Sequence, residues 1–328
     1  MIVCTSGDPF SVNIELYFKI FSQTLSAGLP CPVVYIGNEW QWNHQLSRLG
    51  LRPDSIPMAR IESLHEAQNN EFYLMAQDGP EIPAEHLTSV ERGTLAVGSL
   101  REVRNCLPSR PLAVLTAPID KKACNEAGFG FPGQTEYFEE IWNTRGIMVL
   151  AGPKLKVGLV TNHLPVHKIS EAINRDLMIE KALSFAQTLK QTFKIDRPRI
   201  AICGLNPHCG EGGTCGREEI NIMAPAFEKL IQMQPEAEFS GPLPADTVFW
   251  QSIQGQFDGV LAMYHDQGLG PLKTVHFFDA INLTGGLPHL RVSPDHGPAA
   301  NLFLKGHARE DSIKLAWDTC LQYMSHKA

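Results

Sequence analysis

The alternation of short apolar segments with longer amphipathic ones constrains the fold of this chain more than any other feature. Six runs have the character of buried strands: Ile2–Thr5, Val33–Ile36, Leu112–Thr116, Lys156–Val160, Arg199–Cys203 and Gly259–Ala262. Helical patterns are found at Ile14–Leu25, Ile169–Phe193, Glu218–Gln232, Asp246–Gln254 and about Asp311–Ser325. Repeated strand–helix alternation predicts an α/β fold with a largely parallel sheet.

A length of 328 residues is more than one hydrophobic core usually spans, so we expect two domains. Stretches rich in glycine and proline at 128–133 and 284–288 are the candidate boundaries. The first domain would contain residues 1–127 and about 286–328, with the last helix folding back onto it. The second domain would contain residues 128–285.

Composition excludes some partners. The net charge of −7 argues against a nucleic-acid or anionic-membrane partner, because both require a basic surface. No apolar stretch approaches the roughly 20 residues of a membrane span. The first residues, MIVCTSGDPFS, are typical of a strand and not of a signal peptide, and the eight cysteines are sparse. We therefore expect a reduced, cytoplasmic protein.

One motif is deceptive. The segment Gly128–Gly133 matches the G-x-G-x-x-G pattern of dinucleotide-binding proteins. That fingerprint needs a strand before it and a helix opening inside it. Here a helical stretch, Lys121–Ala127, precedes the glycines and Pro132 interrupts them. The segment is therefore interpreted as a turn, and no Rossmann fingerprint is expected.

Three histidines occupy equivalent positions. His163, His208 and His265 each follow a predicted strand. Ligands bind beyond the carboxyl ends of strands in open α/β sheets, and imidazoles suit borderline cations such as Zn²⁺. The three histidines together predict a metal site, although each alone is typical of a hydrogen-bonded loop residue. Asp246 and Asp266 could orient imidazoles or transfer protons, and Asp246 could instead be a helix N-cap.

A rival site involves cysteines. His208, Cys209 and Cys215 lie close enough in sequence to bind zinc. Their Cys-x5-Cys spacing differs from the usual Cys-x2–4-Cys, and no second pair follows nearby. The three-histidine site is therefore the favoured hypothesis.

Several long segments resemble the 4-hydroxythreonine-4-phosphate dehydrogenase family of the vitamin B6 pathway. The resemblance extends from about residue 112 to the C-terminus and is weaker over the first 110 residues. The matching segments are LAVLTAPIDKKACNEAGFGFPGQTEYF, TNHLPVHKIS, RIAICGLNPHCGEGGTCGREEI, GPLPADTVF, VLAMYHDQGLGPLK and INLTGGLPHLRVSPDHGPA.

This resemblance implies a fold, an assembly and a set of ligands. The fold would be similar to that of isocitrate and isopropylmalate dehydrogenases, with two α/β/α domains. The family binds one divalent metal (Zn, Co, Mg or Mn) through histidines that match His163, His208 and His265. Two of them come from one subunit and one from the other, which implies a homodimer with a shared active site.

The resemblance also implies the reaction. The family oxidises the C3 hydroxyl of 4-phosphohydroxy-L-threonine with NAD⁺ and then releases CO₂, which gives 3-amino-2-oxopropyl phosphate. Lys273 or Asp246 is the candidate base, and the Arg291 guanidinium suits the phosphate. The remaining expected contacts are with substrate at Gln134, Thr135, Lys273 and Asn282, and with the nucleotide at Asp295 and His296.

Two departures from the family pattern keep alternatives open. Gln134 stands where the family usually has histidine, and it cannot titrate as histidine does. In the first turn the usual glycines are replaced, so that Phe10 and Asn13 could crowd a ligand. A related dehydrogenase of another phosphorylated hydroxy acid, or a non-catalytic metal-binding relative, remains a second hypothesis.

Overall fold

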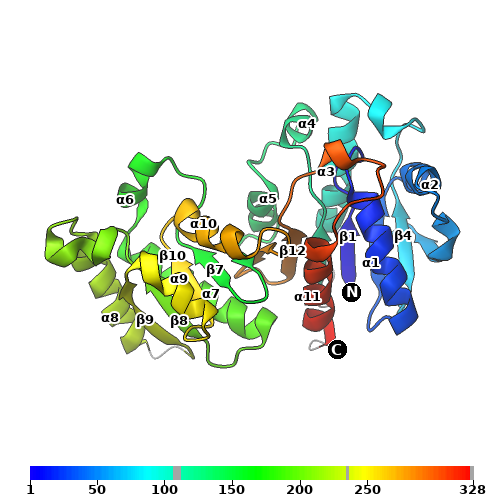
Figure 1. Ribbon diagram of the computed structural model, residues 1–328. Helices are drawn as coiled ribbons and strands as arrows, with labels where there is room; N and C mark the ends of the chain where they lie inside the picture. The colour runs from blue at the N-terminus through cyan, green and yellow to red at the C-terminus, as the bar shows by residue number, and fades with distance from the viewer. Residues whose placement is uncertain (106–111, 234–235, 326–328) are drawn as a thin grey trace. The chain divides into compact units, whose positions relative to one another are not determined.

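The computed structural model describes residues 1–105, 112–233 and 236–325. The chain divides into two compact units. Unit 1 contains Met1–Asn143 and Pro288–Ala328, and unit 2 contains Thr144–Leu287. Both units combine a sheet with helices, which confirms the predicted α/β class (Figure 1).

The sheet of unit 1 is parallel in every strand pair that the described residues form. Its strands follow the order β3-β4-β2-β1-β5-β12. Their bounds are β1 (Ile2–Thr5), β2 (Val33–Gly37), β3 (Met58–Ile61), β4 (Phe72–Ala76), β5 (Ala113–Thr116) and β12 (Leu290–Pro294). Because β1, β5 and β12 run in the same direction, the segments that follow them meet at one edge of the sheet.

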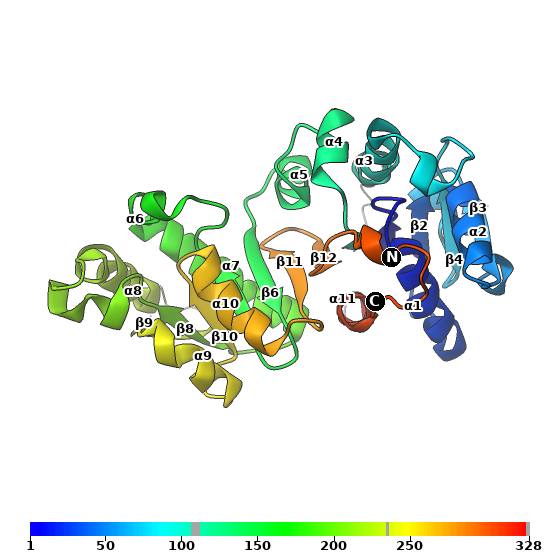
Figure 2. The ribbon, with the colours of Figure 1, turned by 45° about the horizontal axis from the view of Figure 1, so that its top comes forward.

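Helices cover both faces of this sheet, with α3 on one side and α1 and α11 on the other (Figure 2). The helices of unit 1 are α1 (Asn13–Ala27), α2 (Glu39–Arg48), α3 (Ser89–Asn105), α4 (Lys121–Glu126), α5 (Gln134–Ile141) and α11 (Asp311–Ser325). The indole of Trp317, on α11, is buried and donates a hydrogen bond of 2.7 Å to Thr24 on α1. The C-terminal helix therefore folds back onto the first unit, as the sequence predicted.

Unit 1 extends further along the chain than the glycine-rich stretch at 128–133 suggested. Helix α5 belongs to it, because the Tyr137 hydroxyl donates a 3.0 Å hydrogen bond to the Leu100 carbonyl on α3. Phe138 is fully buried beside it. The division between the units falls after Asn143 and again after Leu287, whereas the sequence placed α5 in the second domain.

The close crossing of α3 and α4 leads to a prediction about stability. A Cβ atom on Gly93 would overlap the backbone carbonyl of Ala123, whereas one on Gly98 would meet only the flexible end of Gln77. We expect Gly93→Ala to lower the free energy of unfolding by about 1–3 kcal/mol, because a backbone cannot move aside. Gly98→Ala, in the same helix, should be neutral or stabilising by up to about 1 kcal/mol. Equal effects in chemical denaturation would contradict this packing.

The sheet of unit 2 is mixed and follows the order β11-β6-β7-β10-β8-β9. Its strands are β6 (Ile147–Ala151), β7 (Lys156–Leu159), β8 (Arg199–Cys203), β9 (Glu238–Leu243), β10 (Gly259–Ala262) and β11 (Ile281–Gly285). Strands β7, β10, β8 and β9 are parallel, while β6 runs antiparallel to both of its neighbours. The carboxyl ends of four neighbouring strands therefore share one edge.

Helices cover both faces of this sheet, because successive residues of β7 contact different helices. Val157 and Leu159 belong to the apolar cluster that contains residues of α9 and α10. Gly158, between them, faces the Phe185 ring of α7. The helices of unit 2 are α6 (Ile169–Ala172), α7 (Arg175–Phe193), α8 (Ala224–Gln232), α9 (Ala245–Ile253) and α10 (His265–Val275).

Two predicted helices are interrupted. The helix expected over Ile169–Phe193 breaks into α6 and α7, because the Asn174 side chain accepts the Leu177 N–H and begins a new helix. The helix expected from Glu218 begins with a π-helical turn, Glu219–Met223, and continues as α8. Short turns of 3₁₀ type are assigned at Pro53–Ser55, Leu64–Glu66, Ala84–His86, Val166–Lys168, Pro207–Gly213 and Ala300–Leu302.

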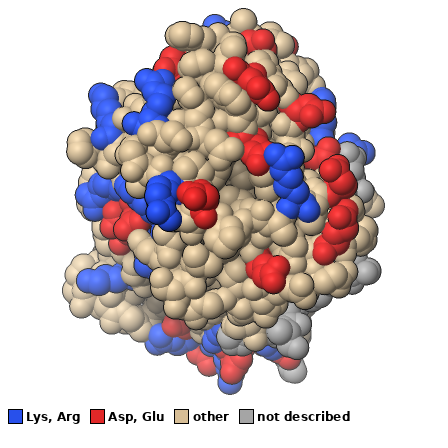
Figure 3. Space-filling view, turned by 90° about the vertical axis from the view of Figure 1, so that its right-hand side faces the viewer, with Lys and Arg blue, Asp and Glu red and all other residues tan. Residues whose placement is uncertain are grey.

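The surface seen in Figure 3 carries lysine and arginine side chains interspersed with aspartate and glutamate. Charges of both signs are mixed on that face, and the whole chain has a net charge of −7. Within the described ranges, no helix is both long and apolar enough to cross a membrane.

Candidate active site

The structure places the three predicted histidines beyond the carboxyl ends of parallel strands in unit 2. His163 follows β7, His208 follows β8, and His265 is the first residue of α10, directly after β10. Since β10 lies between β7 and β8 in the sheet, these segments leave the same edge side by side.

Two of the histidines lie together. The imidazole rings of His163 and His265 have centroids 5.4 Å apart. His163 is exposed, and His265 is half-buried. Two imidazoles that each bind one ion through a nitrogen at about 2 Å can have this separation. The pair therefore fits two ligands of a single divalent cation.

Asp266 orients the second of these imidazoles. Its carboxylate lies 2.7 Å from Nδ1 of His265, which leaves Nε2 available. A carboxylate bonded to the outer nitrogen of a histidine fixes the ring and makes it a stronger metal ligand. This contact is compatible with the orienting role that the sequence suggested for Asp266.

His208 does not join the pair within one chain. Among the residues that the structure describes, no three histidine, cysteine, aspartate or glutamate side chains are grouped as metal ligands. Among these described residues, neither the three histidines nor the rival set of His208, Cys209 and Cys215 forms such a group. Cys209 is a free thiol whose pKa is raised, chiefly by burial.

The loop that carries His208 has an unusual backbone. Five consecutive residues, His208–Gly212, have φ between 45° and 78°, which is the left-handed region. Three of them are not glycine, and each such residue costs about 1–2 kcal/mol. Strain of this kind persists only where the surroundings hold it, and it is concentrated at functional sites. Residues His208–Gly212 thus form a left-handed turn.

A buried carboxylate secures this turn. Glu219 is only 4% exposed and accepts hydrogen bonds from the backbone N–H (2.7 Å) and the side chain (2.9 Å) of Asn206. The Asn206 carbonyl then accepts the N–H of Cys209. Sequence reasoning missed Glu219, because the pair Glu218–Glu219 has the pattern of exposed acids at a helix start.

The other candidates of unit 2 lie on three elements. Asp246 is the second residue of α9, whose N-cap is Pro244 without a side-chain hydrogen bond. The alternative that Asp246 is a helix N-cap is therefore wrong. Lys273 lies in the last turn of α10 with its Nζ 5.8 Å from the centre of the Phe277 ring, and Asn282 lies on β11.

Arg291, in unit 1, is a buried cation. It lies on β12, is 3% exposed, and donates hydrogen bonds of 2.8 and 3.2 Å to the hydroxyl of Thr116. Burial lowers its pKa to about 10, and the carboxylate of Glu136 partly opposes that shift. A guanidinium can bind an anionic ligand, and its burial carries a desolvation cost.

Gln134 and Thr135 begin helix α5. The Gln134 side-chain nitrogen donates a 3.0 Å hydrogen bond to the carbonyl of Ala117, which directly follows β5. This bond fixes the amide orientation, because a carbonyl requires a donor. Gln134 therefore secures the start of α5 against the edge of the sheet.

Phe10 and Asn13, which we expected to crowd a ligand, both make contacts inside the protein. The Asn13 side chain is buried and donates to the carbonyls of Ser6 (3.1 Å) and Pro118 (3.0 Å), so it braces the turn from inside. Phe10 packs on Phe303, with ring centroids 4.7 Å apart. Both substitutions are accommodated by internal contacts.

Asp295 and His296 follow β12, at the same edge as this turn. The backbone N–H of Asp295 donates to the Ser312 hydroxyl at 2.9 Å, and His296 Nδ1 lies 2.8 Å from the Gly297 carbonyl. Pro298 accepts the N–H of Val12, so the segment is attached to the first turn.

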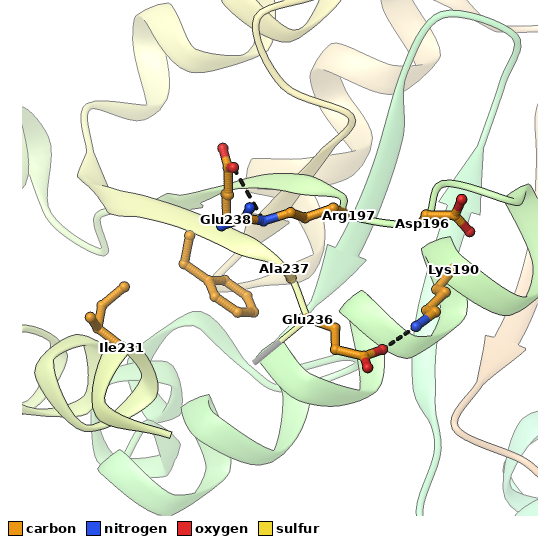
Figure 4. A pocket seen from close by; sticks show the side chains of 8 residues that line it. Lys190, Asp196, Arg197, Ile231, Glu236, Ala237 and Glu238 are labelled. Carbon is orange, nitrogen blue, oxygen red and sulfur yellow. Dashed lines mark hydrogen bonds and ion pairs between the residues drawn. The ribbon is translucent and has the colours of Figure 1, made fainter. Parts of the chain in front are cut away.

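A pocket of about 730 Å³ in unit 2 does not coincide with any candidate residue (Figure 4). It is lined by Lys190, Asp196, Arg197, Ile231, Glu236, Ala237, Glu238 and Phe239. These residues lie around the amino ends of β8 and β9, opposite the edge that carries the histidines. Ligands of open α/β sheets bind at the carboxyl ends, so this pocket is not assigned as the active site.

Comparisons with known proteins identify the family of this chain. The family model of pyridoxal phosphate biosynthetic protein PdxA matches residues 29–320. A 4-hydroxythreonine-4-phosphate dehydrogenase from Pseudoalteromonas translucida (strain TAC 125) is 37% identical over 100% of this chain and 98% of that protein.

Solved structures of proteins with the same name also match this chain. 4-Hydroxythreonine-4-phosphate dehydrogenase from Klebsiella pneumoniae superposes with a TM-score of 0.81 and 33% identity, over 98% of each chain. Isocitrate dehydrogenase from Methylococcus capsulatus has a TM-score of 0.50 and 11% identity, over 98% of this chain and 85% of that one, and shows a shared fold alone. The predicted relation to isocitrate dehydrogenase-type folds is thereby confirmed. This chain belongs to the family of the pyridoxal phosphate biosynthetic protein PdxA.

Proposed function

We propose that this protein oxidises 4-phosphohydroxy-L-threonine with NAD⁺ and a divalent metal, and then decarboxylates the product to 3-amino-2-oxopropyl phosphate, in pyridoxal phosphate biosynthesis. The observation that carries the proposal is the pair of imidazoles, His163 and His265, at the carboxyl edge of the unit 2 sheet. Family membership supports the substrate.

The three histidines would hold the cation. His163 and His265 are already adjacent, and His208 follows the neighbouring strand β8. A bound cation supplies Lewis acidity, first to the substrate hydroxyl and then to the ketone. In line with the resemblance to the family, we propose a homodimer in which one imidazole comes from the second subunit.

The chain's own residues would accept the proton, bind the phosphate and contact the cofactor. Oxidation moves a hydride from C3 of the substrate to NAD⁺ and a proton from its hydroxyl to a base, for which Lys273 and Asp246 are the candidates. Arg291 would bind the phosphate through two N–H groups. Substrate contacts are assigned to Gln134, Thr135 and Asn282, and nucleotide contacts to Asp295 and His296.

A second candidate function is oxidation of another phosphorylated hydroxy acid. Gln134 favours it, because one of its two N–H groups is bound to Ala117 and the side chain cannot provide the charge that a histidine can. A non-catalytic role is disfavoured, because His163, His208, His265 and Lys273 are all retained.

The test is NADH formation by metal-stripped protein, with NAD⁺, 4-phosphohydroxy-L-threonine and one divalent metal added at a time. We expect turnover only after metal is added, detected by the absorbance of NADH. Turnover of other phosphorylated hydroxy acids in place of this substrate would select the second candidate. Metal binding without turnover of any such acid would contradict both.

A further inference from the structure

The ends of two neighbouring strands, β10 and β8, are joined by a side chain instead of by the backbone. The register pairs Leu261 with Ile202, and continuing it by two residues would set Met263 opposite Gly204. Instead, the amide of Gln267 lies between them. The Met263 N–H donates to Gln267 Oε1 at 2.7 Å, and Gln267 Nε2 donates to the Gly204 carbonyl at 2.8 Å.

This link belongs to a row of hydrogen bonds that crosses four strand ends. The Met263 carbonyl accepts the N–H (3.1 Å) and the hydroxyl (2.7 Å) of Thr161, which follows β7. The Gly204 N–H donates to Leu243, at the end of β9, at 2.8 Å. We call these five residues, Thr161, Met263, Gln267, Gly204 and Leu243, the strand-end belt.

Four residues of the strand-end belt lie two to four positions before the proposed catalytic groups, and Gln267 follows His265. Thr161 precedes His163, Met263 precedes His265, Gly204 precedes His208, and Leu243 precedes Asp246. Two of its three connections, β7 to β10 and β8 to β9, are made by backbone groups, with the Thr161 hydroxyl added in the first. Between β10 and β8, the connection depends on the two hydrogen bonds of a single side chain.

We infer that Gln267 is a positioning residue for the metal site. Its amide holds the backbone just before His265 against the end of β8, and so fixes where the His265 imidazole stands at the sheet edge. Glutamine suits this place because it offers a donor and an acceptor at once. Glutamate would still accept the Met263 N–H but would face the Gly204 carbonyl with an oxygen, and methionine would satisfy neither group. This inference rests on the metal site of the proposed function.

The experiment compares wild-type protein with Gln267→Glu and Gln267→Met. Cobalt affinity is measured by competition with a chromogenic chelator, and thermal unfolding is followed on the same samples. We expect both variants to bind cobalt about 10–100-fold more weakly, the usual loss when a group that orients ligands is removed. Gln251→Glu is the matched control, because Gln251 is also half-buried in unit 2 and lies on α9. It should bind cobalt like the wild type.

A readout on metal-free protein separates this inference from the proposed function. The amide of Met263 should exchange with solvent about fivefold faster or more in Gln267→Met, because it loses its acceptor. Wild-type cobalt affinity in both Gln267 variants, or unchanged exchange at Met263, would overturn the inference. Weaker cobalt binding by the variants, in a protein that does not turn over 4-phosphohydroxy-L-threonine, would support the positioning role while contradicting the proposed activity.

Discussion

Replacing His163 by alanine is expected to lower kcat/KM by about a thousandfold or more while leaving thermal stability nearly unchanged. A metal ion contributes several kcal/mol to transition-state stabilisation, and about 1.4 kcal/mol corresponds to a factor of ten in rate. His163 is exposed, and substitutions at exposed positions usually change the free energy of unfolding by less than about 0.5 kcal/mol. The loss would therefore reflect metal binding and not unfolding.

The matched control is His167→Ala, on the same segment. His167 is also exposed and lies in a short turn, Val166–Lys168. We expect wild-type cobalt affinity and turnover from this variant, whereas His163→Ala should lose both. Equal activity in the two variants would remove His163 from the site. His208→Ala should behave like His163→Ala if all three histidines serve one cation.

Replacing Arg291 by methionine should separate stability from activity. The guanidinium is buried and donates its hydrogen bonds to Thr116, so the folded protein bears a desolvation cost that a methionine avoids. We expect the free energy of unfolding to stay equal or to rise by up to about 4 kcal/mol. Activity should fall about a hundredfold or more, because two charge-assisted hydrogen bonds to phosphate are lost.

Arg291→Lys is the informative companion. It keeps the charge but loses the fork that meets two phosphate oxygens, so it should lose activity without gaining stability. Substrate KM and denaturant-induced unfolding are measured for both variants. If Arg291→Met unfolded more easily and kept its substrate KM, Arg291 would be a structural residue and not a phosphate ligand.

The pH dependence gives an independent check on the same residue. Burial lowers the folded-state pKa of Arg291 to about 10. Below that pH the guanidinium is charged in both the folded and the unfolded protein, so its burial lowers the free energy of unfolding by the full desolvation cost. Above about pH 10 the folded protein releases this proton before the unfolded chain does, and the contribution to stability rises with pH. Arg291→Met should lack this rise. The measurement is the difference in unfolding free energy between wild type and variant on either side of pH 10.

Some elements could be predicted from the sequence because their signal is local. Strands β1, β8 and β10 have the predicted bounds, since each is a short apolar run that is buried on both faces. Strand β12 was missed because the charged Arg291 interrupts its apolar pattern. The sequence does not show that the Arg291 guanidinium donates a hydrogen bond to the Thr116 hydroxyl. Helix α10 was missed because Gly268, Gly270 and Pro271 lower its helix propensity.

The candidate site was predictable only in part. The positions of the three histidines follow from strand ends, which the hydrophobic pattern reveals. The left-handed turn at His208–Gly212 does not follow from the pattern, because three of its residues are not glycine and their conformation depends on contacts such as that of Glu219 with Asn206. The role of Gln267 depends on the register of β10 and β8, which only the three-dimensional structure provides.

The most direct test of the proposed activity is the joint measurement of NADH and CO₂ from one reaction. Metal-stripped protein is given NAD⁺ and 4-phosphohydroxy-L-threonine, with and without added divalent metal. Oxidative decarboxylation predicts one CO₂ for each NADH, and neither product before metal is added. NADH without CO₂, or equal turnover in the absence of metal, would contradict the account.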